Sequence, residues 1–519
     1  MTVHRRALRI RTAAALASCA TVALVGCSAN APTDDTAALL DPSTRGAAWQ
    51  AEAFSELYAQ EIEWFECGPD EGLDDATAEE LAGVGVDLDE VGCAAVLAPL
   101  DWNDPENSET IELSIVHIPS TGSDEPIGTL TGNPGGPGAT GVDFMLGMPL
   151  SPGFEGVLES YDLLGFDPRG IGGSTPLDCD DITSDIVAVQ IAECGERSPL
   201  VHTMGTVQVA RDMELLRHLI GADRLDYLGY SYGTMLGATY ASIFPDEVGR
   251  MVLDSAENAA WASPIHLFDQ QVAAANAMVA LATACRTEYA DEVEVCPFTS
   301  EESLLAVIAE LNATPLVASD GTEITGEVLR GYLWDALYSS TFERGRTLDT
   351  IALALFGDQG AIDGIGEAAA GGAGLDLAFT VVTCHSFPIE PDVTGLLAHI
   401  EETGVPKLLG GSELTDEVLA PFLDLSCYAL PESGLDYTES FDAAGAGPIL
   451  VIGITGDHAT PFQYAQVLAD ELGDATLLTL DGQGHAASYT GRSSCIDDAV
   501  TRYLLDGKMP KAGTVCTDD

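Results

Sequence analysis

Short apolar runs alternate with amphipathic helical patterns between about residues 93 and 256. Ile111–Ile118 alternates apolar and polar residues, as a half-buried strand does. Thr206–Ile220 instead carries apolar residues three and four positions apart, which is typical of a helix with one buried face. This alternation predicts a mostly parallel sheet that is covered by helices on both faces. The other predicted elements of this part are strands at Ile127–Thr131, Tyr161–Phe166, Leu225–Tyr230 and Arg250–Leu253 and a helix at Thr234–Phe244.

The pattern changes after residue 258. Residues 259–444 are rich in Ala, Leu and Glu, with helical spacing and a glycine-rich patch at 364–374. Strands resume at Pro448–Ile454 and Thr476–Leu480, with helices predicted at Phe462–Leu472 and Ser494–Leu505. We therefore expect one α/β core, formed by residues 48–258 and 445–519, that is interrupted by a large helical insertion at 259–444.

The first 26 residues have the pattern of an export signal. Four arginines and no acidic residue precede an apolar stretch from Ala13 to Val25, which is too short to span a bilayer stably. The stretch ends in Leu24-Val25-Gly26-Cys27 and resembles a bacterial lipoprotein signal, in which the cysteine after the cut carries the lipid. We expect lipidation at Cys27 and a polar tether over 27–47; the alternative is a cleaved signal with an incidental cysteine. No later apolar run reaches about 18 residues, so the expected membrane contact is through this lipid only.

Composition narrows the classes of function. The 519 residues include 83 acidic and 20 basic side chains, a net charge of −63, and 46% are hydrophobic. The apolar fraction is that of a globular chain, which excludes a disordered acidic tail. Nucleic-acid binding is not expected, because phosphate contacts require Lys or Arg. A surface of this charge favours solubility and attracts cationic ligands.

Ten cysteines remain after Cys19, in the signal, and Cys27 are set aside. An even number in an exported chain predicts disulfides rather than free thiols. No Cys-x-x-Cys or paired-histidine spacing is present, so we expect no metal site. Short separations favour Cys179–Cys194, Cys285–Cys296 and Cys495–Cys516, and elimination leaves Cys67–Cys93 and Cys384–Cys427.

Gly229-Tyr230-Ser231-Tyr232-Gly233 is a Gly-x-Ser-x-Gly motif between a predicted strand and a predicted helix. This is the setting of a nucleophile elbow, in which the serine occupies a strained turn and the glycines let neighbouring backbone approach. The positive end of the helix dipole would also lie near a developing oxyanion. We predict that Ser231 is a nucleophile; the alternative is a buried turn serine.

A serine nucleophile needs a base and a carboxylate that orients the base. In α/β-hydrolases they follow the serine in the order Asp or Glu, then His. Asp457 follows the strand Pro448–Ile454, and His485 follows the next strand, so both are expected at the carboxyl edge of the sheet. We predict a Ser231–His485–Asp457 triad; the alternatives are a helix cap near Pro461 for Asp457 and a plain loop histidine for His485. His458 is a lesser candidate for the base.

An oxyanion hole needs two backbone N–H groups, one of them from the residue after the nucleophile, here Tyr232. The loop Gly132–Gly138 follows an early strand and contains five glycines and prolines after Asn133. We predict that Gly136 supplies the second donor, with Gly135 in reserve; the alternative is a plain turn. A phosphate-binding loop would continue with Lys-Ser or Lys-Thr, which is absent, and Gly170-Ile171-Gly172-Gly173 lacks dinucleotide spacing, so no cofactor is expected.

Two further polar residues are predicted to be structural. Arg169, in Asp167-Pro168-Arg169-Gly170, is expected in a buried ion pair. His385, beside Cys384 in the insertion, is expected to have a structural contact rather than a catalytic role.

Together these motifs resemble the exported tripeptidyl aminopeptidase-like group of α/β-hydrolases, in peptidase family S33, of the actinobacterial lipoprotein type. In the C-terminal tail, Cys495, Tyr503-Leu504, Asp506-Gly507, Pro510 and Cys516 resemble the TAP-like region of that group. The resemblance implies an α/β-hydrolase fold with a helical cap, the triad and oxyanion residues named above, no cofactor, and cleavage near a free peptide N-terminus. The matching stretches are Gly132–Gly138, Asp162–Thr175, Gly229–Phe244, Arg250–Asp254, Pro448–Pro461 and Asp481–Cys516.

The chain departs from the group at two places. The group usually reads Asp-Gly-x-x-Asp-Pro after the strand Arg250–Leu253, whereas this chain reads Asp254-Ser255-Ala256-Glu257-Asn258. The cap cysteine Cys384 is followed by His385-Ser386 rather than closely by an acidic residue. An aminopeptidase needs a carboxylate for the substrate ammonium; Glu257 is one candidate, and a solvated acid is the alternative.

The sequence thus predicts a lipid-anchored serine hydrolase outside the cytoplasm that acts on a peptide or a small ester. Two other functions remain open. One is an esterase or lipase with the same triad. The other is a catalytically inactive binding lipoprotein that kept the fold, because a fold does not by itself imply a function.

Overall fold

The computed structural model describes residues 45–519 apart from 178, 180–181, 185, 291–292, 372–376, 412–421, 423–425 and 439. Cys27 and the predicted export signal lie outside the described residues. In the part of the chain that is described, no helix has the length and apolar character needed to cross a membrane.

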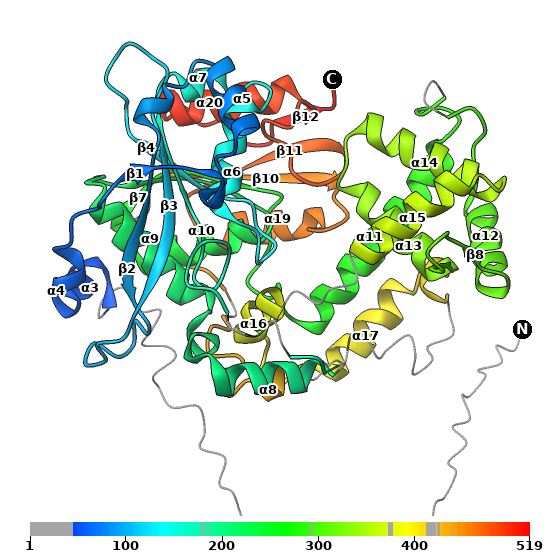
Figure 1. Cartoon of the computed structure of the whole chain (residues 1–519), viewed down its shortest axis with the longest axis horizontal. Helices are drawn as coiled ribbons and strands as arrows, with labels where there is room; N and C mark the ends of the chain where they lie inside the picture. The colour runs from blue at the N-terminus through cyan, green and yellow to red at the C-terminus, as the bar shows by residue number, and fades with distance from the viewer. Residues whose placement is uncertain are drawn as a thin grey trace, which may run out of the picture.

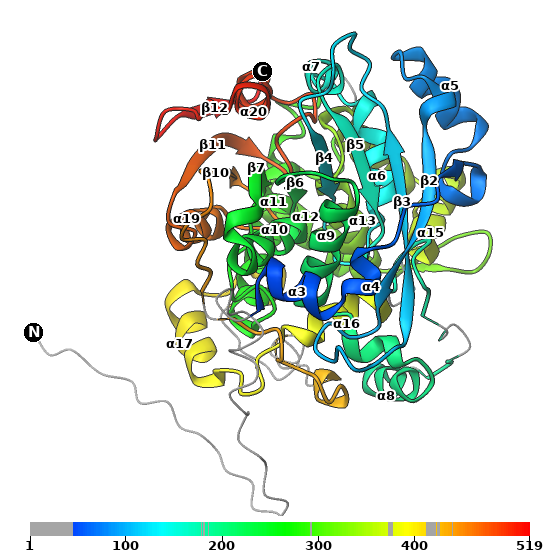
Figure 2. The ribbon, with the colours of Figure 1, turned by 90° about the vertical axis from the view of Figure 1, so that its left-hand side faces the viewer.

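A ten-stranded sheet forms the centre of the protein, in the order β1-β2-β3-β5-β4-β6-β7-β10-β11-β12. The strands from β5 to β12 pair in parallel, while β1, β2 and β3 form an antiparallel edge. The prediction of a mostly parallel sheet is confirmed, and the antiparallel edge adds to it. Figure 2 shows the strands fanning out from β11 to β2. The strands are β1 Phe65–Glu66, β2 Gly92–Pro99, β3 Thr110–Ile118, β4 Thr129–Asn133, β5 Asp162–Phe166, β6 Leu225–Tyr230, β7 Val248–Asp254, β10 Ile449–Gly456, β11 Ala475–Gln483 and β12 Val515–Thr517.

Helices cover both faces of the sheet, because its central strands are apolar on both sides. On one face α9, α10 and α19 pack against residues such as Tyr227 and Val451. On the other face α6, α7 and α20 pack against residues such as Leu228 and Ile452. The helices of the core are α3 Ala47–Ala53, α4 Ser55–Tyr58, α5 Asp75–Gly83, α6 Gly141–Gly147, α7 Glu155–Leu158, α8 Val187–Arg197, α9 Thr206–Leu219, α10 Tyr232–Ile243, α19 Phe462–Glu471 and α20 Ser494–Asp506.

The chain between β7 and β10 forms a helical cap, most of which lies beside the sheet in Figure 1. Helices α11 to α15 share an apolar core of their own that includes Leu281, Leu304 and Leu333. Helix α16 instead joins the core of the sheet through Val381 and Val382. The cap elements are α11 Pro264–Ala284, α12 Glu301–Ala313, β8 Leu316–Val317, β9 Glu323–Ile324, α13 Gly326–Leu337, α14 Thr341–Leu355, α15 Gln359–Gly371, α16 Leu377–His385 and α17 Val393–Thr403.

Five disulfides link the chain, and each joins a pair of cysteines predicted from the sequence. Two disulfides, Cys285–Cys296 and Cys384–Cys427, join residues of the cap. A third, Cys495–Cys516, joins α20 to β12. Disulfides persist in oxidising compartments, so this set is typical of a protein outside the cytoplasm. The pairs are Cys67–Cys93, Cys179–Cys194, Cys285–Cys296, Cys384–Cys427 and Cys495–Cys516.

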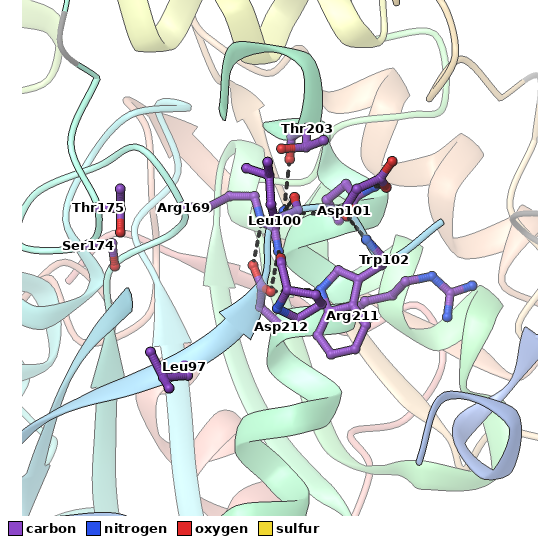
Figure 3. A network of polar contacts seen from close by, with 12 residues as sticks. Leu97, Leu100, Asp101, Trp102, Arg169, Ser174, Thr175, Thr203, Arg211 and Asp212 are labelled. Carbon is purple, nitrogen blue, oxygen red and sulfur yellow. Dashed lines mark hydrogen bonds and ion pairs between the residues drawn. The ribbon is translucent and has the colours of Figure 1, made fainter. Parts of the chain in front are cut away.

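Arg169 forms the predicted buried ion pair, and its partner is Asp212 on α9 (Figure 3). Both side chains are fully buried. The guanidinium donates two hydrogen bonds to the carboxylate, from Nε at 2.8 Å and from Nη2 at 2.6 Å. It also donates to the carbonyls of Leu100 and Thr203, and Trp102 Nε1 donates to Asp212 at 2.8 Å. The network therefore joins α9, the end of β2 and the loop after β5.

Breaking this pair is expected to destabilise the fold. In Arg169→Met the Asp212 carboxylate stays buried without its cation, so we expect the free energy of unfolding to fall by about 3–5 kcal/mol. Urea unfolding would measure the change, with the exposed Arg502→Met as a matched control. In the double variant with Asp212→Leu the loss should be smaller than the sum of the two single losses. A single variant as stable as the Arg502 control would contradict this account of the network.

Candidate active site

The candidate residues all follow strands that are adjacent in the sheet, at the carboxyl ends of those strands. Asn133 at the end of β4 pairs with Gly229 of β6, and Tyr230 pairs with Asp254 of β7. Strand β7 is next to β10, and Gly456 of β10 pairs with Gln483 of β11. The loops that begin at 134, 231, 457 and 484 therefore meet at one edge, where α/β active sites lie.

Ser231 occupies a sharp turn between β6 and α10. Its φ of 55° is in the left-handed region, which a residue with a side chain rarely adopts. A Cβ atom on Gly229 would lie 2.5 Å from the Gly233 carbonyl, and one on Gly233 would lie 2.5 Å from the Asn133 carbonyl. Glycine is thus needed on both sides of the turn, as the motif predicts. Helix α10 begins at Tyr232, two residues earlier than predicted, because the turn at Ser231 leads directly into it.

The loop after β4 lies against this turn. A Cβ atom on Gly135 would come within 2.9 Å of both Ser231 Cβ and Tyr232 N. The N–H of Gly135, the other candidate donor, already donates to Asn133 Oδ1 at 2.9 Å and is therefore not free to bind an oxyanion. Asp167 supports the end of the loop by accepting a hydrogen bond from Val142 N in α6 at 3.0 Å. This geometry favours Gly136 over Gly135 as the second oxyanion donor.

His485 is hydrogen-bonded to Asp457, as predicted. Its Nδ1 lies 2.9 Å from Asp457 Oδ1 and 3.1 Å from Oδ2. Asp457 is buried and also accepts hydrogen bonds from the backbone N–H groups of Ala459 and Thr460, both at 2.9 Å. The helix that follows, α19, has Pro461 as its N-cap, so Asp457 does not serve as that cap.

The two partners shift each other's protonation. Burial alone would lower the pKa of His485, but the charge and hydrogen bond of Asp457 outweigh it, and the pKa is raised above its usual value. Burial likewise would raise the pKa of Asp457, yet His485 holds it below its usual value. The pair therefore favours an ionised carboxylate that stabilises an imidazolium, as a base in acyl transfer requires.

The other two histidines that the sequence singled out are not hydrogen-bonded to Asp457, although the His458 ring lies 5.8 Å from that of His485. His458 is fully buried, its ring nitrogens have no hydrogen-bond partner, and burial lowers its pKa to about 3. It cannot take up a proton readily, so His485 is the better candidate for the base. His385 is buried and its Nε2 lies 2.9 Å from the Val201 carbonyl, a structural contact as predicted.

Three neighbours of the pair were missed by the sequence analysis. Thr460 Oγ1 donates to Asp457 Oδ2 at 2.9 Å. Tyr338, at the end of cap helix α13, places its ring 5.6 Å from the ring of His485 and 4.5 Å from that of His458. Asp254 accepts hydrogen bonds from the loop after His485. Only Asp254 had a sequence signal, since it ends a strand beside β6.

Glu257 is buried, which excludes a freely solvated acid at this position. Its Oε2 lies 3.0 Å from His266 Nε2, in ion-pair range, although that oxygen accepts no hydrogen bond and His266 Nδ1 has no partner. Its charge contributes to the raised pKa of His485. A cavity of about 610 Å³ reaches its partner His266, and the lining of the cavity also includes Tyr464, the acidic Glu390 and Asp392, and apolar residues of the cap.

No group of three or more His, Cys, Asp or Glu side chains is arranged to hold a metal ion anywhere in the described ranges.

Comparison with known proteins shows the family of the chain. The family profile described as alpha/beta hydrolase fold matches residues 133–293, and the one described as TAP-like protein matches residues 417–516. Carboxylesterase B of Mycobacterium tuberculosis is 32% identical over 463 residues, which cover 82% of this chain and 86% of that protein. The chain belongs to the TAP-like α/β-hydrolases.

Two other relatives of this TAP-like hydrolase are named as peptidases. Serine protease Hip1 of Mycobacterium tuberculosis is 29% identical over 481 residues, which cover 82% of this chain and 87% of that protein. Tripeptidyl aminopeptidase of Streptomyces lividans is 32% identical over 286 residues, about half of each chain. The TAP-like hydrolase is a serine hydrolase.

Proposed function

We propose that Ser231 is the nucleophile, His485 the general base and Asp457 the residue that orients the imidazole. Ser231 Oγ attacks the substrate carbonyl carbon while His485 Nε2 takes the hydroxyl proton. The resulting oxyanion accepts hydrogen bonds from the N–H groups of Gly136 and Tyr232. His485 then gives its proton to the leaving group, which departs and leaves an acyl ester on Ser231. The observation that carries this proposal is the His485–Asp457 hydrogen bond beside a strained serine turn.

A water molecule completes the cycle by the same route. His485 takes a proton from the water, the hydroxide oxygen attacks the acyl ester, and Ser231 Oγ leaves with the proton that His485 returns. The proposed reaction steps involve no electron transfer and no cofactor.

We further propose that the substrate is a peptide with a free N-terminus, from which a short peptide is removed. Two relatives carry the names of peptidases, and Glu257 offers a buried carboxylate whose Oε2 accepts no hydrogen bond and lies 3.0 Å from His266 Nε2. A substrate ammonium would pair with this oxygen, and the cavity at His266 would receive an apolar side chain. The strongly acidic chain also favours a cationic substrate end.

The substrate proposal predicts that acetylation of the substrate amine slows hydrolysis. We expect a tripeptidyl aminocoumarin to be hydrolysed faster than its N-acetylated form. In Glu257→Gln the KM for the free-amine substrate should rise about tenfold to a hundredfold, with little change for the acetylated one. Steady-state kinetics measure both, with Glu310→Gln, an exposed change on α12, as the matched control. Equal loss on both substrates would refute an ammonium site at Glu257.

An esterase is the second candidate, because Carboxylesterase B shares 32% identity over most of the chain. The same triad and oxyanion donors would act on an ester. Hydrolysis of a nitrophenyl ester without cleavage of either peptide substrate would establish this alternative.

We also propose that Cys27 carries a lipid that anchors the enzyme at the outer face of the cell membrane. Small residues before a cysteine, directly after an apolar stretch, support this. Cys27→Ser should move the protein from the detergent phase to the aqueous phase in a detergent-partition experiment on whole cells. Retention of the variant in the detergent phase would contradict the lipid anchor.

A further inference from the structure

Asp254, the last residue of β7, contacts both the candidate nucleophile and the loop of the candidate base. Its backbone carbonyl accepts a hydrogen bond from Ser231 N at 3.0 Å. Its fully buried carboxylate accepts hydrogen bonds from Ala487 N at 3.2 Å, Ser488 N at 2.7 Å and Ser488 Oγ at 2.5 Å. One residue thus fixes the distance between the turn at Ser231 and the residues that follow His485.

The loop that Asp254 holds has an unfavourable backbone conformation. Ala486 and Tyr489 have φ angles of 63° and 58°, and Ser255, which accepts a hydrogen bond from Ala486 N at 2.8 Å, has a φ of 53°. Side chains disfavour this region, so such conformations persist only where surrounding contacts impose them. The carboxylate of Asp254 and the hydroxyl of Ser255 are contacts of that kind, and they begin at the residue directly after His485.

Tyr230 adds a third connection between the same segments. Its hydroxyl donates to the carbonyl of Ser488 at 2.7 Å, from the residue directly before Ser231. The loop at 486–488 is therefore held at each of its residues, by side chains from the carboxyl ends of β6 and β7. His485 directly precedes this loop, so these contacts lie next to it in the chain.

We propose that Asp254 is a positioning residue for His485, whose carboxylate holds the loop 486–488 so that the imidazole stays between Asp457 and Ser231. The inference rests on the proposed triad and goes beyond it, since Asp254 touches neither the substrate nor the imidazole. The alternative is a purely structural buried carboxylate with no particular effect on the reaction.

The test uses Asp254→Asn in the full chain, because the amide carries no charge and places an NH2 group where one carboxylate oxygen accepts from Ala487 N. We expect kcat per active site to fall roughly 10- to 100-fold on an ester substrate, since small misplacements of catalytic groups have effects of this size. KM should stay within about twofold. The acid limb of the pH–rate profile should move to lower pH, because the negative charge of Asp254 contributes to the raised pKa of His485.

Asp226→Asn is the matched control, since Asp226 accepts a hydrogen bond from Arg250 N at the opposite end of β6 and β7. Ser255→Ala, which removes the acceptor for Ala486 N without changing charge, should lower kcat several-fold and leave the acid limb in place. It also keeps the test decisive if Asp254→Asn does not fold. Fluorophosphonate titration counts active sites and separates misfolding from misplacement.

The inference is overturned if folded Asp254→Asn and Ser255→Ala retain the parent kcat, or if Asp226→Asn loses as much kcat as Asp254→Asn. Failure of the proposed function is distinguishable, because the parent protein itself would then not be labelled at Ser231. Labelling of the parent with unchanged rates in both loop variants would contradict only the role of Asp254.

Discussion

Ser231→Ala is expected to lower kcat by a factor on the order of 10⁶ on any substrate that the enzyme accepts. The change removes only the oxygen that would attack the carbonyl. Alanine retains the Cβ atom, so the steric strain of the turn, with its φ of 55°, is the same for both residues. The loss should therefore appear in kcat, with stability and KM close to those of the parent.

Steady-state kinetics on the peptide and ester substrates would measure this loss. Ser242→Ala is the matched control, because Ser242 lies on the same helix, α10, and its hydroxyl donates only to the carbonyl of Ala238. Activity of Ser231→Ala near that of the parent would show that another group performs the attack.

Asp457→Asn is expected to lower kcat by a factor on the order of 10⁴, as in other triads of this type. The carboxylate accepts from His485 Nδ1, and its remaining hydrogen bonds come from Ala459, Thr460 N and Thr460 Oγ1. An amide turns one acceptor into a donor, so it either loses these contacts or holds the imidazole in the wrong tautomer. It also removes the charge that stabilises the imidazolium.

The pH profile gives Asp457→Asn a second readout. The base must be neutral to act, so kcat/KM rises as pH increases through the pKa of His485, which lies above the usual 6.5 in the parent. Removal of the Asp457 charge lowers that pKa, and the acid limb should move to lower pH. Asp470→Asn, an exposed change on α19, should leave both kcat and the limb in place. A limb that stays at the parent position in Asp457→Asn would contradict the pairing.

The sequence predicted the parts of the fold that rest on local patterns. The strand Leu225–Tyr230 could be read from its apolar run and the helix from Thr206 from the spacing of its apolar residues. The expectation of one buried face on that helix was too narrow, because α9 is buried at every residue from Thr206 to Arg217. Three of the disulfides followed from short separations, and the other two followed by elimination. The antiparallel edge formed by β1 to β3 was not predicted, since β1 is only two residues long and its pairing is set by contacts distant in sequence.

Some residues of the candidate site could likewise be predicted from local sequence patterns, and others could not. Ser231, Asp457 and His485 could be named because motif and position after a strand point to them. Tyr338 could not, because only the packing of the cap brings α13 next to His485. The burial of Glu257 and the contacts of Asp254 likewise depend on which loops meet at the carboxyl edge, and a single sequence does not specify that meeting.

The assignment of Ser231 as the nucleophile is tested most directly by labelling with a fluorophosphonate, followed by peptide mapping by mass spectrometry. The account predicts one phosphonylated residue, Ser231, in the parent, no label in Ser231→Ala, and much slower labelling in Asp457→Asn. Label on a different serine, or none in a folded parent protein, would contradict it.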